Sequence, residues 1–231
     1  DGYPDLFVPN NVSGAASWLY KNNQDGSFTD VAVTAGATLT NNACTGAIAG
    51  DYDNDGYDDL FVTCGEYSPS DPAIEENVLL RNKGDGTFEN VTTVAGLGGD
   101  GTRNPSYAAA FGDLDGDGDL DLYVGGYTLG GFPTRTCEPN NLYINNGDGT
   151  FTDKAVELGL SDAGCTLGVT LTDYDHDGDL DIFVINDFSP ENGGQNPPPR
   201  MYRNDNGGQV FTEVTQQIGL NNPTYGMGVA S

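Results

Sequence analysis

A nine-residue acidic pattern recurs along this chain and constrains its fold more than any other feature. The pattern is D-x-D-x-D-G-x-x-D, and its three complete copies begin at Asp51, Asp113 and Asp173. Each copy runs directly into a short apolar segment, and the first eight residues read as the second half of a fourth copy. The glycine at loop position 6 recurs about every 60 residues, as Gly2, Gly56, Gly118 and Gly178. Such a period indicates tandem structural repeats.

A second motif follows each acidic loop and contains an Asp-Gly or Gly-Gly pair. It occupies 19–28, 79–88 and 142–151, and a copy that is one residue longer occupies 201–211. Asp-Gly between two short apolar runs is a strong hairpin signal, because glycine supplies the positive φ that such turns need. One unit is therefore predicted to be strand, aspartate loop, strand, variable loop, strand, Asp-Gly turn and strand.

Four antiparallel strands in about 60 residues make one blade of a β-propeller. The chain has 34 glycines among 231 residues and no sustained helical periodicity, which favours many short strands over helices. We therefore predict an all-β fold, a β-propeller of four-stranded antiparallel blades, as one domain over 1–231. The expected repeats are approximately 1–42, 43–104, 105–164 and 165–220, with 221–231 as a first strand of the next or closing blade.

The sequence leaves three arrangements of the ends open. The strand expected at 226–231 could pair with the first repeat and close a four-bladed ring. Alternatively, the four repeats could belong to a larger ring. In the third arrangement the end of one chain completes the start of the next, head to tail, which would build a calcium-dependent filament.

The acidic loops have the composition of calcium sites. Carboxylates at loop positions 1, 3, 5 and 9, with the backbone carbonyl of position 7, form an oxygen cage, and glycine at position 6 permits the bend. Oxygen ligands without histidine or cysteine select Ca²⁺ over zinc or copper, and Mg²⁺ gives up its waters reluctantly. A solvated acidic turn would explain one loop, but three copies in the same register favour a metal. The predicted ligands are Asp51, Asp53, Asp55, Tyr57, Asp59, Asp113, Asp115, Asp117, Asp119, Asp121, Asp173, Asp175, Asp177, Asp179 and Asp181, with Asp1, Tyr3 and Asp5 forming part of a fourth site.

The charge of the chain limits its partners. It carries 35 acidic and 8 basic residues, a formal net charge of −27. Phosphates would be repelled, so nucleic acid is not an expected partner, and neither is an anionic membrane surface. No stretch approaches the ~20 apolar residues of a membrane-spanning helix, so membrane insertion is not expected.

The four cysteines suggest disulfides and an oxidising compartment, since their number is even and they form no C-x-x-C pair. Cys44 and Cys64 lie nearly symmetrically about the loop centred near Asp55. If the flanking strands pair, the two side chains fall opposite each other. A Cys137–Cys165 bridge follows by elimination, and four free buried thiols are the alternative.

The two motifs together resemble those of a known family. Phe111-Gly112 before a loop, G-D-Y-D-N-D-G-Y-x-D-L-F-V from Gly50 and L-x-R-N-x-G-D-G-T-F from Leu79 resemble the FG-GAP (VCBS-type) repeat. This repeat occurs in integrin α-subunit propellers and in secreted proteins with an ASPIC/UnbV domain. The resemblance covers essentially the whole chain. It implies a propeller with calcium loops on one face, an extracellular location, and adhesion through protein or carbohydrate binding.

A binding or structural protein is predicted rather than an enzyme. The only histidine, His176, occupies loop position 4, where side chains point to solvent, and the obvious acid pairs are committed to metal. A domain of a polysaccharide-degrading enzyme is the second alternative, after the filament subunit.

The expected protein or glycan partner would bind the face opposite the calcium loops, on the segments 66–76, 95–107, 126–140 and 188–199. Aromatic and arginine side chains suited to such contacts lie there: Tyr67, Arg103, Tyr127, Phe132 and Arg135. Trp18 is expected to pack at a blade edge. Asn11 and Asn90 begin acceptor sequences for N-glycosylation.

Overall fold

The computed structural model is almost entirely β-structure, which confirms the predicted fold class. It describes residues 2–12, 14–40, 42–65, 76–98, 105–129, 136–162, 164–188 and 198–222. In these ranges the strands form three four-stranded sheets, one three-stranded sheet and one two-stranded ribbon, and every pairing is antiparallel. One helix of four residues, α1 (Ala32–Ala35), occurs in the described part of the chain.

We call the four sheets blades 1 to 4 in chain order. Blade 1 contains β1 (Leu6–Val8), β2 (Trp18–Asn22) and β3 (Phe28–Asp30). Blade 2 contains β4 (Cys44–Gly50), β5 (Asp59–Cys64), β6 (Val78–Asn82) and β7 (Phe88–Asn90). Blade 3 contains β8 (Ser106–Gly112), β9 (Asp121–Gly126), β12 (Asn141–Asn145) and β13 (Phe151–Asp153), with the ribbon β10 (Thr128–Leu129) and β11 (Thr136–Cys137) attached. Blade 4 contains β14 (Cys165–Thr172), β15 (Asp181–Phe188), β16 (Arg200–Asn204) and β17 (Phe211–Glu213).

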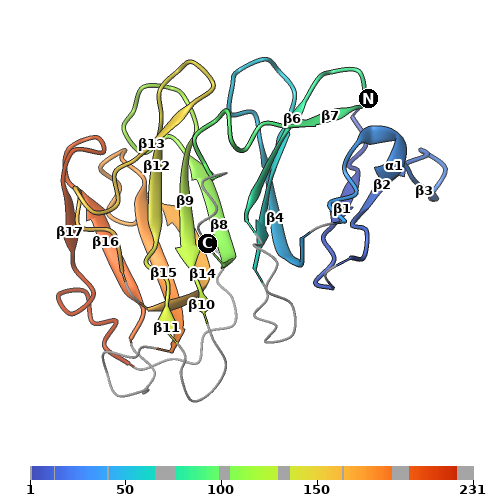
Figure 1. The fold of residues 1–231 in the computed structure, drawn as a ribbon. Helices are drawn as coiled ribbons and strands as arrows, with labels where there is room; N and C mark the ends of the chain where they lie inside the picture. The colour runs from blue at the N-terminus through green and yellow to red at the C-terminus, as the bar shows by residue number, and fades with distance from the viewer. Residues whose placement is uncertain are drawn as a thin grey trace.

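Within each blade the strands are paired in the order of the chain, as the predicted unit requires. The blades stand side by side in the same order, from blade 1 at the right of Figure 1 to blade 4 at the left. The first strands of consecutive complete blades contact each other, β4 with β8 and β8 with β14. This radial stacking of blades through their first strands is the arrangement of a β-propeller.

The hydrophobic core is divided into layers between consecutive blades. Phe61 and Leu79 of blade 2 pack with Leu122 and Val124 of blade 3, and the ring of Phe61 meets that of Phe111 edge-on at 6.4 Å. A separate layer of the same kind lies between blades 3 and 4. Each blade therefore buries apolar side chains mainly against the blades beside it.

A single helical turn follows the outer strand of each blade, and the sequence analysis did not predict it. In blade 1 this turn is α1, which buries Ala32 and Ala35 and ends at Gly36 with φ 74°. In blade 3 the corresponding turn is closed by a hydrogen bond from the backbone amide of Leu160 to the carbonyl of Ala155, at 2.8 Å. The available signal is a small or apolar residue, then glycine, then an apolar residue, in a segment too short for helical periodicity.

Both predicted disulfides are present, and no described cysteine is free. Cys44 lies opposite Cys64 in the register of β4 and β5, as the symmetry about the loop indicated. Cys137 of the ribbon is joined to Cys165 in the first strand of blade 4, so this bridge connects two blades.

The predicted closing strand lies mostly outside the described residues, which end at 222. Among the described residues β1 pairs only with β2 and is the edge of a three-stranded sheet. The three arrangements of the ends therefore remain predictions.

Candidate metal centres

Each acidic loop connects the first and second strands of its blade and gathers three carboxylates. These come from loop positions 1, 3 and 9, and in each loop one ligand atom from each residue lies within 4.8 Å of the others. The three groups, which we call the triads, are Asp51, Asp53 and Asp59; Asp113, Asp115 and Asp121; and Asp173, Asp175 and Asp181.

The position-1 carboxylate bends the loop around itself. In blade 2, Asp51 accepts the backbone amides of Asp55 at 3.0 Å and Gly56 at 2.9 Å through its two oxygens. Gly56 has φ 91°, which glycine adopts without strain. Asp173 in blade 4 accepts the two equivalent amides at 3.1 and 3.2 Å. The spacing of the acidic pattern thus produces the loop conformation as well as the charge.

The position-9 carboxylate is buried and held from two sides. Asp59 is fully buried, and its Oδ2 accepts the amide of Tyr52 at 3.2 Å while its Oδ1 accepts the amide of Asn82 at 2.7 Å. Burial raises the pKa of Asp59 to about 6, against the opposing effect of these two hydrogen bonds. Asp121 has the same environment, and burial raises its pKa to about 6 as well.

The position-3 carboxylate of blade 2 has an oxygen that suits a cation. Asp53 Oδ1 is buried and has no hydrogen-bond partner, while Oδ2 forms an ion pair with Arg81 Nε at 3.1 Å. Burial, followed by repulsion from Asp55, raises the pKa of Asp53. A buried anionic oxygen beside two further carboxylates is costly unless a cation compensates it. The residues present therefore fit a hard divalent cation.

The position-5 carboxylates lie outside the triads. Each of them accepts the backbone amide of the residue at position 7 instead: Asp55 from Tyr57 at 3.0 Å, Asp117 from Asp119 at 2.9 Å and Asp177 from Asp179 at 3.0 Å. Their role as metal ligands, and that of the position-7 carbonyls, stays a prediction.

The partial fourth site can be followed only in part. Asp1 is outside the described residues, and Tyr3 is half-exposed. Asp5 Oδ1 accepts the amide of Asn22 at 2.8 Å, which repeats the contact of Asp59 with Asn82. Blade 1 therefore retains the position-9 part of the loop geometry.

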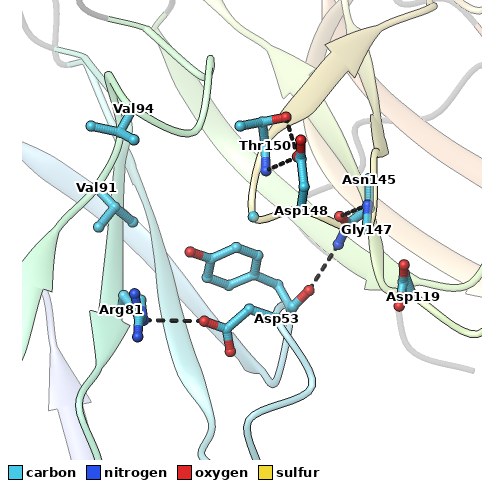
Figure 2. A pocket seen from close by; sticks show the side chains of 11 residues that line it. Asp53, Arg81, Val91, Val94, Asp119, Asn145, Gly147, Asp148 and Thr150 are labelled. Carbon is cyan, nitrogen blue, oxygen red and sulfur yellow. Dashed lines mark hydrogen bonds and ion pairs between the residues drawn. The ribbon is translucent and has the colours of Figure 1, made fainter.

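A polar cavity of about 350 Å³ lies beside the blade 2 loop (Figure 2). Blade 2 contributes Tyr52 and the ion pair of Asp53 with Arg81, and blade 3 contributes Asp119 and Asp148. Asn54 of the blade 2 loop donates its side-chain amide to Asp119 Oδ1 at 2.6 Å. The cavity thus lies between the acidic loop and outer strands of blade 2 and the Asp-Gly turn of blade 3, with Asp119 of the blade 3 loop at its wall.

Most of the predicted partner-binding residues fall outside the described part of the chain. Tyr67, Arg103, Phe132 and Arg135 lie outside the described residues. Tyr127 is half-buried, donates its hydroxyl to Asp187 of blade 4 at 2.9 Å, and its ring lies 4.2 Å from that of Tyr107. Its contacts therefore join blades 3 and 4 at the end of the sheets away from the acidic loops.

The other residues singled out from the sequence lie at the surface. His176 is exposed at loop position 4 with φ 62°. Trp18 is 38% exposed and begins β2, the central strand of blade 1, and not an edge strand as predicted. Asn11 and Asn90 are both exposed. Asn90 Oδ1 accepts the hydroxyl of Thr92, the third residue of its acceptor sequence, at 2.8 Å. Ser13, the equivalent residue after Asn11, is outside the described residues.

Comparison with known proteins identifies the class to which these blades and loops belong. The FG-GAP-like repeat family matches residues 1–62, 67–124 and 133–184, well over half of the chain, and the chain belongs to this family. A curated relative is cartilage acidic protein 1 of Xenopus tropicalis, 36% identical over 89 residues. The match covers 37% of this chain and 12% of that protein.

No helix among the described residues is long and apolar enough to cross a membrane.

Proposed function

We propose that this chain is a calcium-stabilised extracellular propeller that acts in adhesion or as part of a surface structure. The observation that carries the proposal is the triad, repeated three times with a buried position-9 aspartate. Two carboxylates 4 Å apart repel by about 4 kcal/mol at an effective dielectric constant near 20. Three such groups in each loop therefore need a cation at neutral pH, and the all-oxygen donor set selects Ca²⁺.

Calcium would have a structural role. Sites of extracellular modules bind with dissociation constants of about 10⁻⁴–10⁻³ M. At millimolar calcium each site then adds on the order of 1 kcal/mol to the free energy of unfolding. The ions would hold the loop ends of the blades in place, and the opposite ends would carry the partner-binding segments. The two disulfides and the family membership support an extracellular location.

Thermal unfolding with and without calcium tests the calcium part of the proposal. The midpoint should rise in millimolar CaCl₂ relative to chelator, and MgCl₂ at the same concentration should have a much smaller effect. The matched variants are Asp115→Asn, within a triad, and Asp148→Asn, an exposed aspartate of the Asp-Gly turn. The first should reduce the calcium-dependent rise and the second should not. An unchanged midpoint in calcium would overturn the proposal.

The adhesion part can be tested through the charge of the partner. A chain with net charge −27 associates most readily with basic or neutral surfaces. Binding should be measured to immobilised basic matrix proteins, neutral glycans and sulfated glycans at 50 and 300 mM NaCl. Calcium-dependent binding to one of the first two, absent for the sulfated glycans, is expected. No calcium-dependent binding to any of the three would contradict an adhesive role.

Calcium-dependent self-assembly is the second candidate function, and the observation that favours it is the edge of blade 1. The edge strand β1 exposes Leu6 by 50% and Val8 by 39%. An exposed apolar edge is a template for pairing with another strand. Light scattering in calcium and in chelator distinguishes the candidates. A mass near 24.3 kDa in both conditions would contradict self-assembly.

A further inference from the structure

We propose that Asn145 and Asn204 are positioning residues that couple the metal loops of neighbouring blades, so that calcium at one loop strengthens calcium binding at the next. This inference rests on the proposed calcium binding. Asn145 ends β12 in blade 3, and its Nδ2 donates to the backbone carbonyl of Tyr52, in the loop of blade 2, at 2.8 Å. The same amide also donates to the carbonyl of Leu120, in the loop of its own blade, at 3.1 Å. One side chain therefore bridges two loops.

Blade 4 repeats the arrangement with blade 3. Asn204 donates to the carbonyl of Leu114, in the loop of blade 3, at 2.7 Å, and to the carbonyl of Leu180, in its own loop, at 3.3 Å. Asn145 is 4% exposed and Asn204 is fully buried. Buried hydrogen bonds of this kind are costly to break, because water does not replace the lost partner.

These bridges lie on a continuous path between metal-site carboxylates. The amide of Tyr52 donates to Asp59, its carbonyl accepts from Asn145, and the amide of Asn145 donates to Asp121 at 2.9 Å. Two residues thus separate the buried aspartate of one triad from that of the next. An equivalent path runs from Asp121 through Leu114 and Asn204 to Asp181.

Side-chain packing reinforces the same contacts. The ring of Tyr52 inserts toward blade 3, with its centroid 5.6 Å from that of Phe151. In blade 4, Gly208 has φ 73° and lies so close to the blade 3 loop that a Cβ on it would be 2.6 Å from Cβ of Asp115. The turn of one blade thus rests on a triad residue of the preceding blade.

Coupling follows from what calcium does to the loop. Binding orders the loop backbone, including the residue at position 2 whose carbonyl accepts the asparagine of the next blade. That asparagine then holds the next position-9 aspartate by its own amide. Because the first ion has already ordered part of the second site, the second ion orders less on binding, and the two binding events are positively coupled.

Asn82 of blade 2 supplies a matched control. Its amide donates to Asp59, its Oδ1 accepts the amide of Gly84 at 3.0 Å, and its Nδ2 donates to the carbonyl of Asp58 at 3.0 Å. These are the bonds that Asn145 makes within its own blade. Within the described part of the chain, Asn82 makes no hydrogen bond to another blade. Asn82→Ala therefore removes the two local side-chain bonds alone, and Asn145→Ala removes the equivalent side-chain bonds and the bridge. Both variants keep the backbone amide that donates to the position-9 aspartate.

The test is a calcium titration of the full chain, monitored through the NMR chemical shifts of the backbone amides of Gly56 and Gly118. Each of these amides donates to the position-1 aspartate of its own loop, so each reports one site. Asp115→Asn weakens the blade 3 site while keeping an oxygen for the amide of Asp117. In the otherwise wild-type chain, Asp115→Asn should also raise the calcium concentration at the midpoint of the Gly56 shift, by about fivefold. This remote effect should persist with Asn82→Ala and fall below about twofold with Asn145→Ala.

Two outcomes would overturn the coupling. Either the Gly56 midpoint does not respond to Asp115→Asn, or it responds equally with and without Asn145. Neither outcome would affect the proposed calcium binding, which this titration would contradict only if the glycine amides did not shift with calcium at all. If Asn145→Ala does not fold, Asn145→Ser removes the bridge with a smaller change. The pair Gly118 and Gly178, with Asn204→Ser, repeats the test between blades 3 and 4.

Discussion

The backbone amide of Asn82 donates to Oδ1 of Asp59 at 2.7 Å, and this contact joins the two motifs of the repeat. Blade 3 has the same bond from Asn145 to Asp121 at 2.9 Å, and blade 4 has it from Asn204 to Asp181 at 2.8 Å. The asparagine of the second motif therefore fixes the most buried carboxylate of the acidic loop. The two motifs recur together because one completes the other.

Position 9 should matter more for stability than position 5. In saturating calcium at pH 7, Asp59→Asn is expected to lower the free energy of unfolding by about 1–3 kcal/mol. The reason is that the new NH₂ group would face one of the two backbone amides that donate to Asp59. Asp55→Asn keeps an oxygen for the amide of Tyr57 and is exposed, so its cost should be below about 1 kcal/mol. Urea unfolding of both variants measures the difference. Equal losses would show that the position-5 carboxylate is as important to the occupied site as position 9.

Acidification should have opposite effects on the calcium-free protein and on calcium binding. Burial raises the pKa of Asp59 and of Asp121 to about 6, above the value of about 3.9 for an unfolded chain. Between these values the folded state binds more protons, so the stability of the calcium-free protein should rise as the pH falls from 7 to 5. Calcium must displace the same protons, so its affinity should fall over that range.

Thermal unfolding in calcium-free buffer and calorimetric titration with CaCl₂, both at pH 5, 6 and 7, measure the two effects. Asp121→Asn provides the control. Because it removes this titrating carboxyl, it should reduce the pH dependence of both the calcium-free stability and the calcium affinity. A calcium-free protein that loses stability on acidification from pH 7 to 5 would contradict the raised pKa values.

The two disulfides should differ in how readily they are reduced. Cys44 and Cys64 are buried at 1% and 0% exposure, whereas Cys137 is partly exposed in the ribbon of blade 3. Mild reductant followed by alkylation and mass spectrometry should therefore label Cys137 and Cys165 first. Removing either bridge by a double serine substitution should cost about 3 kcal/mol, from the unfolded-chain entropy of loops of this length. Labelling of the Cys44 pair first would contradict the order of burial.

Local spacing predicted the blade and the loop, because both arise from residues close together in the chain. The symmetry of Cys44 and Cys64 about the loop predicted that these residues face each other across the local hairpin of β4 and β5, although a register shift between Cys44 and Gly46 separates them from the other pairs. The contact of Asn145 with Tyr52 spans 93 residues, and no pattern within one repeat indicates it. Position 5 was predicted as a ligand from its place in the acidic pattern, and that role stays a prediction. The pattern did not indicate that Asp55 accepts a backbone amide of its own loop.

Gly126 should tolerate no side chain, although nothing in the repeat pattern marks it. A Cβ at this position of β9 would lie 2.3 Å from the carbonyl oxygen of Glu138 and 2.6 Å from that of Pro139. Both atoms belong to backbone, so the clash is relieved only by moving the segment between the ribbon and β12. Gly126→Ala is expected to lower the free energy of unfolding by about 1–3 kcal/mol. Gly98→Ala is the control, because its Cβ would first meet the flexible Glu76 side chain at 3.3 Å. If Gly126→Ala proves as stable as Gly98→Ala in urea unfolding, the close approach of this segment to β9 is wrong.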